Sequence, residues 1–315
     1  MTYKPCAMIV FTFKCTALLA GCAFPHSNFP SKETQGIVIS TDSLDREIML
    51  ATPPRRIVSL APSNTEIVFA IGAGDRLVGR DELSDFPTEA LDVESIGSLY
   101  PKVNTEVVIA LEPDLVLAAG ITNPDDVTAL EELGLTIYTT SFPENLSDVY
   151  NDILAVGELT GETTAARAVV DNMQRRVHAV EKIIANANAE DAPTVFYELD
   201  ATDPSKPWTS GPGSLINLLI MTAGGVNIGA ARRESYWQIN LEELVQQDPQ
   251  IIILGSSKYG GQTPTLVSER PGWGQIAAVT AGNVHAFDDD LVSRPGPRLV
   301  QGLETLASII HPDLY

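Results

Sequence analysis

The chain has 315 residues and a formal net charge of -21, and 44% of its residues are hydrophobic. This length is typical of about two globular domains, and the composition is that of a soluble globular protein. The excess of acidic residues argues against nucleic-acid binding, because phosphate recognition requires clustered Lys and Arg.

The three cysteines, Cys6, Cys15 and Cys22, all lie within the first 22 residues. This position excludes an intramolecular disulfide framework, a cysteine-based zinc site and a cysteine nucleophile in the rest of the chain. The histidines at 26, 178, 285 and 311 are too scattered for a zinc-site signature. We therefore expect no resident metal or cofactor.

Residues 1–21 have the features of a signal peptide. Lys4 is followed by an apolar stretch, which Lys14 interrupts, and then by small residues. The segment Leu19-Ala20-Gly21-Cys22 resembles the lipobox of bacterial lipoproteins, in which the cysteine becomes the lipidated first residue. We expect a lipidated Cys22 and a tether and linker over residues 22–52. A free secreted protein and a membrane-spanning anchor are the alternatives.

Short apolar runs alternate with helical patterns from about residue 53 onwards, which predicts parallel α/β sheets. The predicted strands are 56–60, 115–118, 135–138, 194–197, 251–254 and 284–287. The predicted helices are 65–71, 106–111, 125–133 and 214–223. The first of these helices would begin with a capping box, Ser63-Asn64-Thr65-Glu66.

Two segments in different halves of the chain share a pattern. In each, an Asn is followed two positions later by Glu and nine positions later by Pro, just before an apolar strand (Asn104 to Pro113 and Asn240 to Pro249). This repetition predicts two lobes of the same plan.

Residues 161–190 form the predicted connection between the lobes, 53–160 and 191–315. From Glu162 to Ala189 there is no proline or glycine, and apolar residues recur at spacings of three and four. A helix of this length would extend for about 40 Å. The predicted fold is therefore two Rossmann-like α/β lobes joined by one long helix.

Several segments resemble the helical-backbone (class III) periplasmic binding proteins of vitamin B12 and iron–siderophore ABC importers, most closely the vitamin B12-binding type. They are residues 57–66, 78–79, 84–87, 111–116 and 224–228. The resemblance implies a ligand cleft between the lobes and, as partner, an ABC permease dimer with its ATPase subunits. It also implies a monomeric, extracytoplasmic protein without enzymatic activity, anchored to the membrane by lipid.

The resemblance further implies a transported metal-chelate ligand, either cobalamin or another corrinoid, or alternatively an iron–siderophore complex or heme. The residues that match ligand-contacting positions are Tyr100, Trp208, Tyr236, Trp237, Asp290, Arg294 and Arg298. Leu83 and Ala119 depart from the family, because they stand where the vitamin B12-binding members carry aromatic rings. An α/β enzyme is a more remote alternative, because Ser63 and Ser214 lie outside any nucleophile-elbow motif.

Glu106 and Glu242 occupy the same place in the two repeated segments. They match the glutamates with which the vitamin B12-binding type docks onto its permease. The alternative is that each Glu only interacts favourably with the positive end of its own helix.

The anchor prediction can be tested by replacing Cys22 with Ser. Stable anchoring requires two or more acyl chains, so the variant should appear in the soluble extracytoplasmic fraction instead of the membrane fraction. Fractionation and mass spectrometry of the mature N-terminus measure this. Membrane retention of the Ser variant would contradict the lipoprotein assignment.

Overall fold

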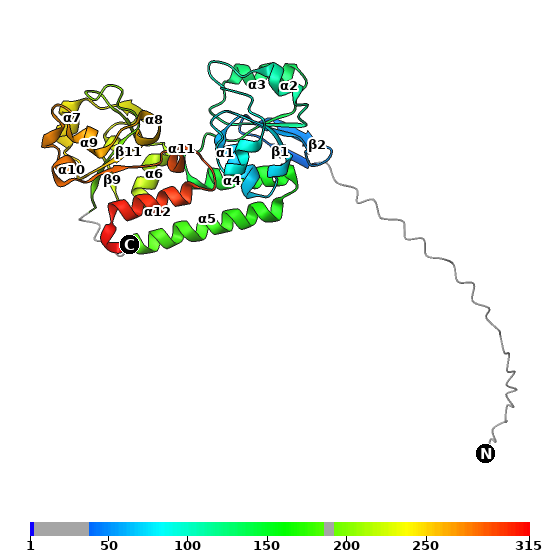
Figure 1. Cartoon of the computed structure of the whole chain (residues 1–315). Coiled ribbons are helices and arrows are strands. Elements are labelled where there is room, and N and C mark those ends of the chain that lie inside the picture. Colours follow the sequence, from blue (N-terminus) through cyan, green and yellow to red (C-terminus); the bar gives the residue numbers. More distant parts are fainter. Residues whose placement is uncertain (3–37, 186–191) are drawn as a thin grey trace. The chain divides into compact units, whose positions relative to one another are not determined.

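The computed structural model describes residues 1–2, 38–185 and 192–315. The predicted signal peptide, Cys22, most of the tether and the last residues of the predicted helix 161–190 lie outside the described residues. The described residues from Val38 to Tyr315 belong to one compact unit that contains two α/β lobes (Figure 1). Among the described residues, no helix combines the length and apolar character that crossing a membrane requires.

Lobe one contains a four-stranded parallel sheet in the order β4-β3-β5-β6. Its strands are β3 (Ile57–Ser59), β4 (Leu77–Arg80), β5 (Leu115–Ala118) and β6 (Ile137–Thr139). Its helices are α1 (Pro62–Ala70), α2 (Thr105–Ala110), α3 (Pro124–Glu132) and α4 (Leu146–Thr160). Because helices cover both faces of such a sheet, every residue of β5 is buried.

Lobe two contains a parallel sheet in the order β12-β11-β7-β9. Its strands are β7 (Thr194–Glu198), β9 (Val226–Asn227), β11 (Ile251–Leu254) and β12 (Val284–Ala286). A separate antiparallel pair consists of β8 (Trp208–Ser210) and β10 (Tyr236–Gln238). The helices are α6 (Leu215–Thr222), α7 (Leu241–Gln247), α8 (Ser257–Gly260), α9 (Pro264–Ser268), α10 (Ala277–Ala281), α11 (Asp290–Ser293) and α12 (Leu299–Ile310).

In each parallel sheet the second strand along the chain lies at one edge beside the first, and the third and fourth strands follow on the other side of the first. This common strand order confirms the predicted repetition. The repeated asparagines, Asn104 and Asn240, are also both N-caps of helices. The side chain of Asn104 accepts a hydrogen bond from the Val107 N–H (3.3 Å), and that of Asn240 accepts one from the Glu243 N–H (2.8 Å). Each Asn therefore caps the helix that precedes a buried strand, α2 or α7.

The repetition extends to a rare backbone conformation. Glu112 and Asp248 each stand directly before the repeated proline, and both have positive φ angles, 46° and 44°. Residues other than glycine rarely adopt this left-handed conformation. Its recurrence at the same position shows that both lobes make the same turn from helix to strand.

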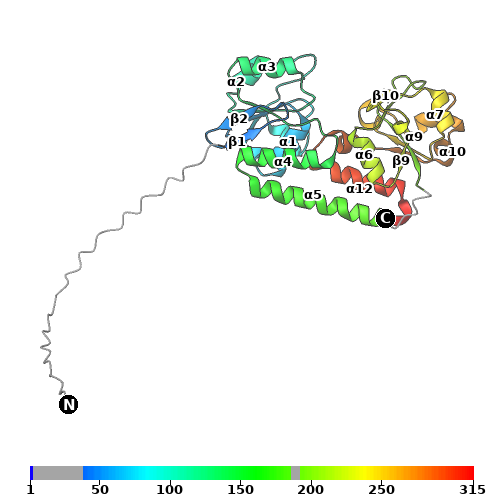
Figure 2. The same cartoon turned by 180° about the vertical axis from the view of Figure 1, so that it is seen from behind.

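Helix α5 (Thr163–Ile184) has 22 residues, corresponding to about 33 Å, and lies beneath both lobes (Figures 1 and 2). Its buried positions, Ala166, Val170, Met173, Val177 and Val180, follow the predicted spacing of three and four. Helices α4 and α12 pack against it. One continuous apolar core consequently runs from lobe one through these helices into lobe two.

Two local predictions were wrong. Helix α1 begins at Pro62 rather than Thr65, and Ala61 precedes it without a side-chain cap. Proline at the first helical position has a suitable φ and lacks the N–H that would need a partner, so no capping box forms. The predicted linker also contains a hairpin of β1 (Val38–Thr41) and β2 (Glu47–Leu50).

Candidate functional site: a cleft between the lobes

A cavity of about 400 Å³ lies between the two lobes and is lined by residues from both. The lining segments of lobe one, residues 119–121 and 141–143, follow the ends of β5 and β6. Leu199 and Asp200 of lobe two follow β7. Ligands of parallel α/β sheets bind at the carboxyl ends of the strands, and here both sheets direct those ends to one cavity.

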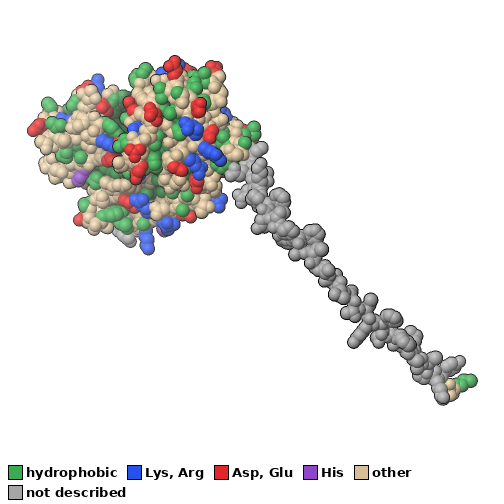
Figure 3. Space-filling model, turned by 45° about the vertical axis from the view of Figure 1, so that its right-hand side comes forward, with side chains coloured by type: hydrophobic (Ala, Val, Ile, Leu, Met, Phe, Trp, Pro, Cys, Tyr) green, Lys and Arg blue, Asp and Glu red, His purple; other side chains and the backbone are tan. Residues whose placement is uncertain are grey.

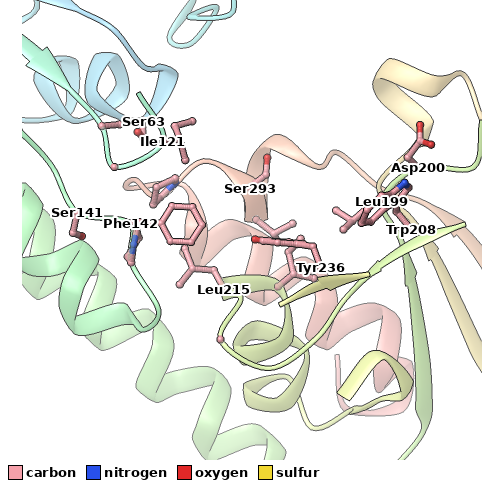
Figure 4. A pocket seen from close by; sticks show the side chains of 17 residues that line it. Ser63, Ile121, Ser141, Phe142, Leu199, Asp200, Trp208, Leu215, Tyr236 and Ser293 are labelled. Carbon is pink, nitrogen blue, oxygen red and sulfur yellow. The ribbon is translucent and has the colours of Figure 1, made fainter. Parts of the chain in front are cut away.

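The cavity has broad apolar walls and few polar groups. Figure 4 shows Phe142 and Ile121 from lobe one on one side of the cavity, with Tyr236 and Trp208 from lobe two opposite them. Ser63, Ser141, Ser293 and Asp200 supply the polar side chains of the lining. Such a lining suits a ligand with large apolar faces and polar edges.

Trp208 and Tyr236, two of the residues that match ligand-contacting positions, line the cavity. Their side chains are 41% and 43% exposed. Trp208 is on β8 and Tyr236 is on β10. The two strands pair with each other, and Tyr236 lies opposite Ser210. The sequence predicted loops here, so the antiparallel pairing is a correction. Burial raises the pKa of Tyr236, so its hydroxyl is a neutral hydrogen-bonding group at neutral pH.

Trp237 lies outside the cavity. Successive side chains of a strand point to opposite faces, so the neighbour of Tyr236 on β10 turns into lobe two. Trp237 is 5% exposed, and its indole N–H donates to the Gly229 carbonyl over 2.9 Å. The structure therefore assigns Trp237 to the core, contrary to its predicted place in the ligand site.

A second cavity of about 350 Å³ adjoins the first, and Ile121 lines both. Tyr100, which is 87% exposed, stands on its rim, and Leu83 is part of its lining. Ala119 lines the first cavity. The two positions at which this chain lacks the aromatic rings of the family thus both face the cleft.

Ile121 and Phe142 are lining residues that the sequence analysis missed. They are 72% and 53% exposed and line the same cavity, and exposed apolar side chains that lie together mark interaction sites. Ile121 follows β5 by three residues, and Phe142 follows β6 by three. That position was the available signal, because the carboxyl ends of such strands carry ligand-binding loops.

Arg298 and Glu66 join the two lobes beside the main cavity. Glu66 is on α1 in lobe one and Arg298 precedes α12 in lobe two. The guanidinium donates to both carboxylate oxygens, over 2.9 and 2.6 Å, and the Glu66 side chain is 2% exposed. Arg298 also lies over the ring of Phe86, 4.1 Å from its centre. This bidentate pair has the geometry of a strong charge-assisted interaction.

Arg294 makes a second connection between the lobes. It donates to Asp85 of lobe one over 2.6 Å and to the Leu83 carbonyl over 3.1 Å. Within lobe two it pairs with Asp290 at 2.9 Å, and Asp290 also binds Lys258. We call these groups, together with Glu66 and Arg298, the interlobe ion cluster.

Asp290, Arg294 and Arg298 were predicted to contact the ligand, but the structure places them elsewhere. None of the three lines either of the two cavities described above, and each is held by partners of opposite charge. Their immediate neighbours Ser293 and Pro295 line the main cavity. The structure therefore places the three residues in the interlobe ion cluster.

Asp85 and Glu66 of the interlobe ion cluster respond to pH in opposite senses. Burial alone would raise the pKa of Asp85, but hydrogen bonding and charge from Arg294 outweigh it and lower the pKa. Its stabilising contribution is lost as pH falls through that lowered value. Burial raises the pKa of Glu66 despite Arg298 and Arg294, so protonation of Glu66 favours the folded state as pH falls towards about 4.3, the value of an unfolded chain.

Glu106 and Glu242 are exposed in the first turns of α2 and α7. Both helices lie on the parts of their lobes that are distant from α5 (Figures 1 and 2). Figure 3 shows acidic and basic side chains intermixed on one face rather than gathered in a basic patch. Within the described residues, no group of three or more His, Cys, Asp or Glu side chains could hold a metal ion.

The chain matches the family of periplasmic binding proteins over residues 57–291. It is 33% identical to the uncharacterized ABC transporter substrate-binding lipoprotein YvrC of Bacillus subtilis, over 95% of this chain and 94% of that protein. The chain belongs to the periplasmic binding protein family. Its two lobes and long helix are the architecture that this family relationship predicts.

Two solved structures of periplasmic binding proteins resemble this one. The vitamin B12-binding protein of Vibrio cholerae has a TM-score of 0.70 and 27% identity, with 83% of this chain and 98% of that chain covered. A heme-binding protein from Pseudomonas aeruginosa has a TM-score of 0.73 and 25% identity, with 82% and 93% covered. The fold is thus shared by proteins that bind different ligands.

Removing Arg298 should strongly destabilise the protein. An Arg298→Ala variant leaves the carboxylate of Glu66 buried without its main partner, which typically lowers the free energy of unfolding by about 3 kcal/mol or more. Arg176→Ala is the control, because Arg176 and its partner Glu304 are each 37% exposed, and such pairs contribute about 1 kcal/mol or less. Denaturant unfolding measures both. Equal losses would contradict the structural role of the interlobe pair.

Proposed function

We propose that the protein is the extracytoplasmic solute-binding component of an ABC importer and that it carries a corrinoid, such as cobalamin, to its permease. The observation that carries this proposal is the two-lobed cavity, whose walls are apolar and whose charged groups are all acidic. Family membership supports the transport role, and the cavity chemistry supports the choice of ligand.

The two cavities favour a neutral or cationic ligand over an anionic one. Asp200 lines the first cavity, and Asp81, Glu82 and Asp126 line the second. Among the described residues, neither lining includes Lys, Arg or His. A corrinoid presents a flat macrocycle edged with neutral amides, which apolar walls and hydrogen-bond acceptors can hold.

Heme and ferric siderophores are the alternative ligands within this fold. Heme carries two carboxylates, and many siderophore complexes are anionic, so both would meet acidic groups in the cleft. Burying an anion without a cationic partner is strongly unfavourable. Arg294, whose neighbours Ser293 and Pro295 line the main cavity, already binds Asp290 and Asp85. A heme-binding protein is among the structural neighbours, but the lining supports the corrinoid.

Delivery requires a surface that the permease recognises. Glu106 and Glu242 are exposed, one on each lobe, at equivalent positions of the repeat. We propose that they dock onto basic residues of a dimeric permease, each half of which offers the same surface. Lipidation of Cys22 would keep the protein at the membrane that holds the permease.

Trp208→Ala should weaken binding of cyanocobalamin. Loss of one aromatic side chain from a binding pocket commonly costs about 2 kcal/mol, which is roughly thirtyfold in affinity. Isothermal titration calorimetry of the purified protein measures the change in affinity. Tyr315→Ala, which removes an exposed aromatic outside both cavities, should bind as the unaltered protein does. Equal affinities for the two variants would remove Trp208 from the proposed site.

Reversing both docking charges should abolish delivery without affecting capture. The double variant Glu106→Lys, Glu242→Lys is expected to bind ligand normally but to lose permease-stimulated ATP hydrolysis and uptake, because like charges across an interface repel. The matched control is Glu94→Lys, Glu269→Lys, which changes net charge equally at exposed positions of the same two lobes. Normal uptake with the first variant would show that the two glutamates serve only their helices.

A further inference from the structure

We infer that the second cavity is a subsite for a hydrogen-bond-donating arm of the transported molecule, a primary amide or an amine, and that Asp126 is its acceptor. This inference deepens the proposed function and rests on it. The main cavity would hold the macrocycle, and the second cavity would select among molecules by the chemistry at their edges.

The position of the second cavity suits such an arm. It shares the lining residue Ile121 with the main cavity, and its other lining residues, which include Leu60 after β3 and the segment 98–103, all belong to lobe one. Its volume of about 350 Å³ is close to that of the main cavity. A ligand seated between the lobes could therefore extend a side arm into lobe one without leaving the cleft.

Asp126 has one carboxylate oxygen with no partner. The side chain lines the second cavity and the residue is 1% exposed. Its Oδ2 accepts a hydrogen bond from the Val103 N–H over 3.2 Å, whereas its Oδ1 is buried and makes no hydrogen bond in the described structure. Buried acceptors are nearly always satisfied, and leaving one unpaired is costly, more so for a charged group. A donor from the ligand would complete this carboxylate.

The helix that carries Asp126 does not explain its burial. Asn123 caps α3 by accepting a hydrogen bond from the Asp125 N–H over 3.0 Å. Asp125 is exposed in the same first turn and supplies a negative charge near the positive end of the helix. The hydrogen bond from the Val103 N–H uses only one carboxylate oxygen of Asp126, Oδ2. The charge and the second oxygen of Asp126 therefore remain available for another purpose.

The remaining acids determine which donor fits. Asp81 is 2% exposed and lines the same cavity, as does the exposed Glu82. Asp81 is already satisfied by the Leu83 N–H, at 3.0 Å, and by the Ser84 hydroxyl. An amide or ammonium group would bond to Asp126 and meet no repulsion. A carboxylate arm would face three acids, so the subsite should reject it.

The test compares two corrinoids that differ at these arms. Dicyanocobinamide carries peripheral amides, and dicyanocobyrinic acid carries carboxylates in their place. The unaltered protein should bind the amide form at least tenfold more tightly. Asp126→Asn should weaken dicyanocobinamide binding about tenfold or more, because a bond to a charged group is worth about 1.5–3 kcal/mol. The Asn side chain can accept from Val103 or from the ligand, but its NH₂ then faces the other donor.

The affinity ratio of the two corrinoids distinguishes recognition from a structural role, because misfolding would weaken both. Asp126→Asn should reduce this ratio about tenfold or more, while Asp125→Asn, with the same charge change one residue away, should leave it unchanged. Thermal unfolding without ligand checks that each variant is folded. Asp126→Ser, which keeps an oxygen for the Val103 N–H, provides the same test if the Asn variant does not fold.

Two results would overturn the inference, and they differ in what else they overturn. If the unaltered protein prefers dicyanocobinamide and Asp126→Asn keeps the same ratio, the subsite is wrong and the proposed function stands. If the unaltered protein binds neither corrinoid, or binds heme more tightly than dicyanocobinamide, the proposed function fails and the subsite fails with it.

Discussion

The cleft depends on holding the carboxyl ends of two parallel sheets towards one another. Parallel strands connected by helices place all their carboxyl-end loops on one edge, so each lobe alone presents half of a site. Helix α5 and the core shared with α4 and α12 hold the lobes from below. The interlobe ion cluster holds them beside the cavity. The relative position of the two lobes is thus held by apolar packing against α5 and by buried ion pairs beside the cavity.

The division of work between aromatic and charged side chains follows from this arrangement. Trp208 and Tyr236 are half exposed and unobstructed, so their faces are free for a ligand. Arg294 and Arg298 are more buried and already bonded to carboxylates. Recruiting either for a ligand would deprive Asp85 or Glu66 of its hydrogen-bonded cation. The charged residues therefore maintain the site, and the apolar ones are suited to contacting the ligand.

The sequence was informative wherever the evidence was local or repeated. Periodicity predicted α5, and the spacing from Asn104 and Asn240 predicted the common plan of the lobes. Pairings between distant segments were less accessible. The β8–β10 ladder joins two segments that each read as loops, so only the structure separates Tyr236 from Trp237. Similarly, an Arg matched to a ligand-binding position gives no sign that Glu66, 232 residues earlier, has already engaged it.

The wide sequence separation of Glu66 and Arg298 has a consequence for how the protein matures. Synthesis proceeds from the N-terminus, so α1 and the sheet of lobe one are complete long before Arg298 exists. Until Arg298 is in place the carboxylate of Glu66 lacks its bidentate partner, and burying it is unfavourable unless it takes up a proton. The first lobe therefore reaches its full stability only when the last helix, α12, has been made and docked. Assembly of the cleft is thereby coupled to completion of the chain, because the cation that Glu66 binds lies only 17 residues from its last residue.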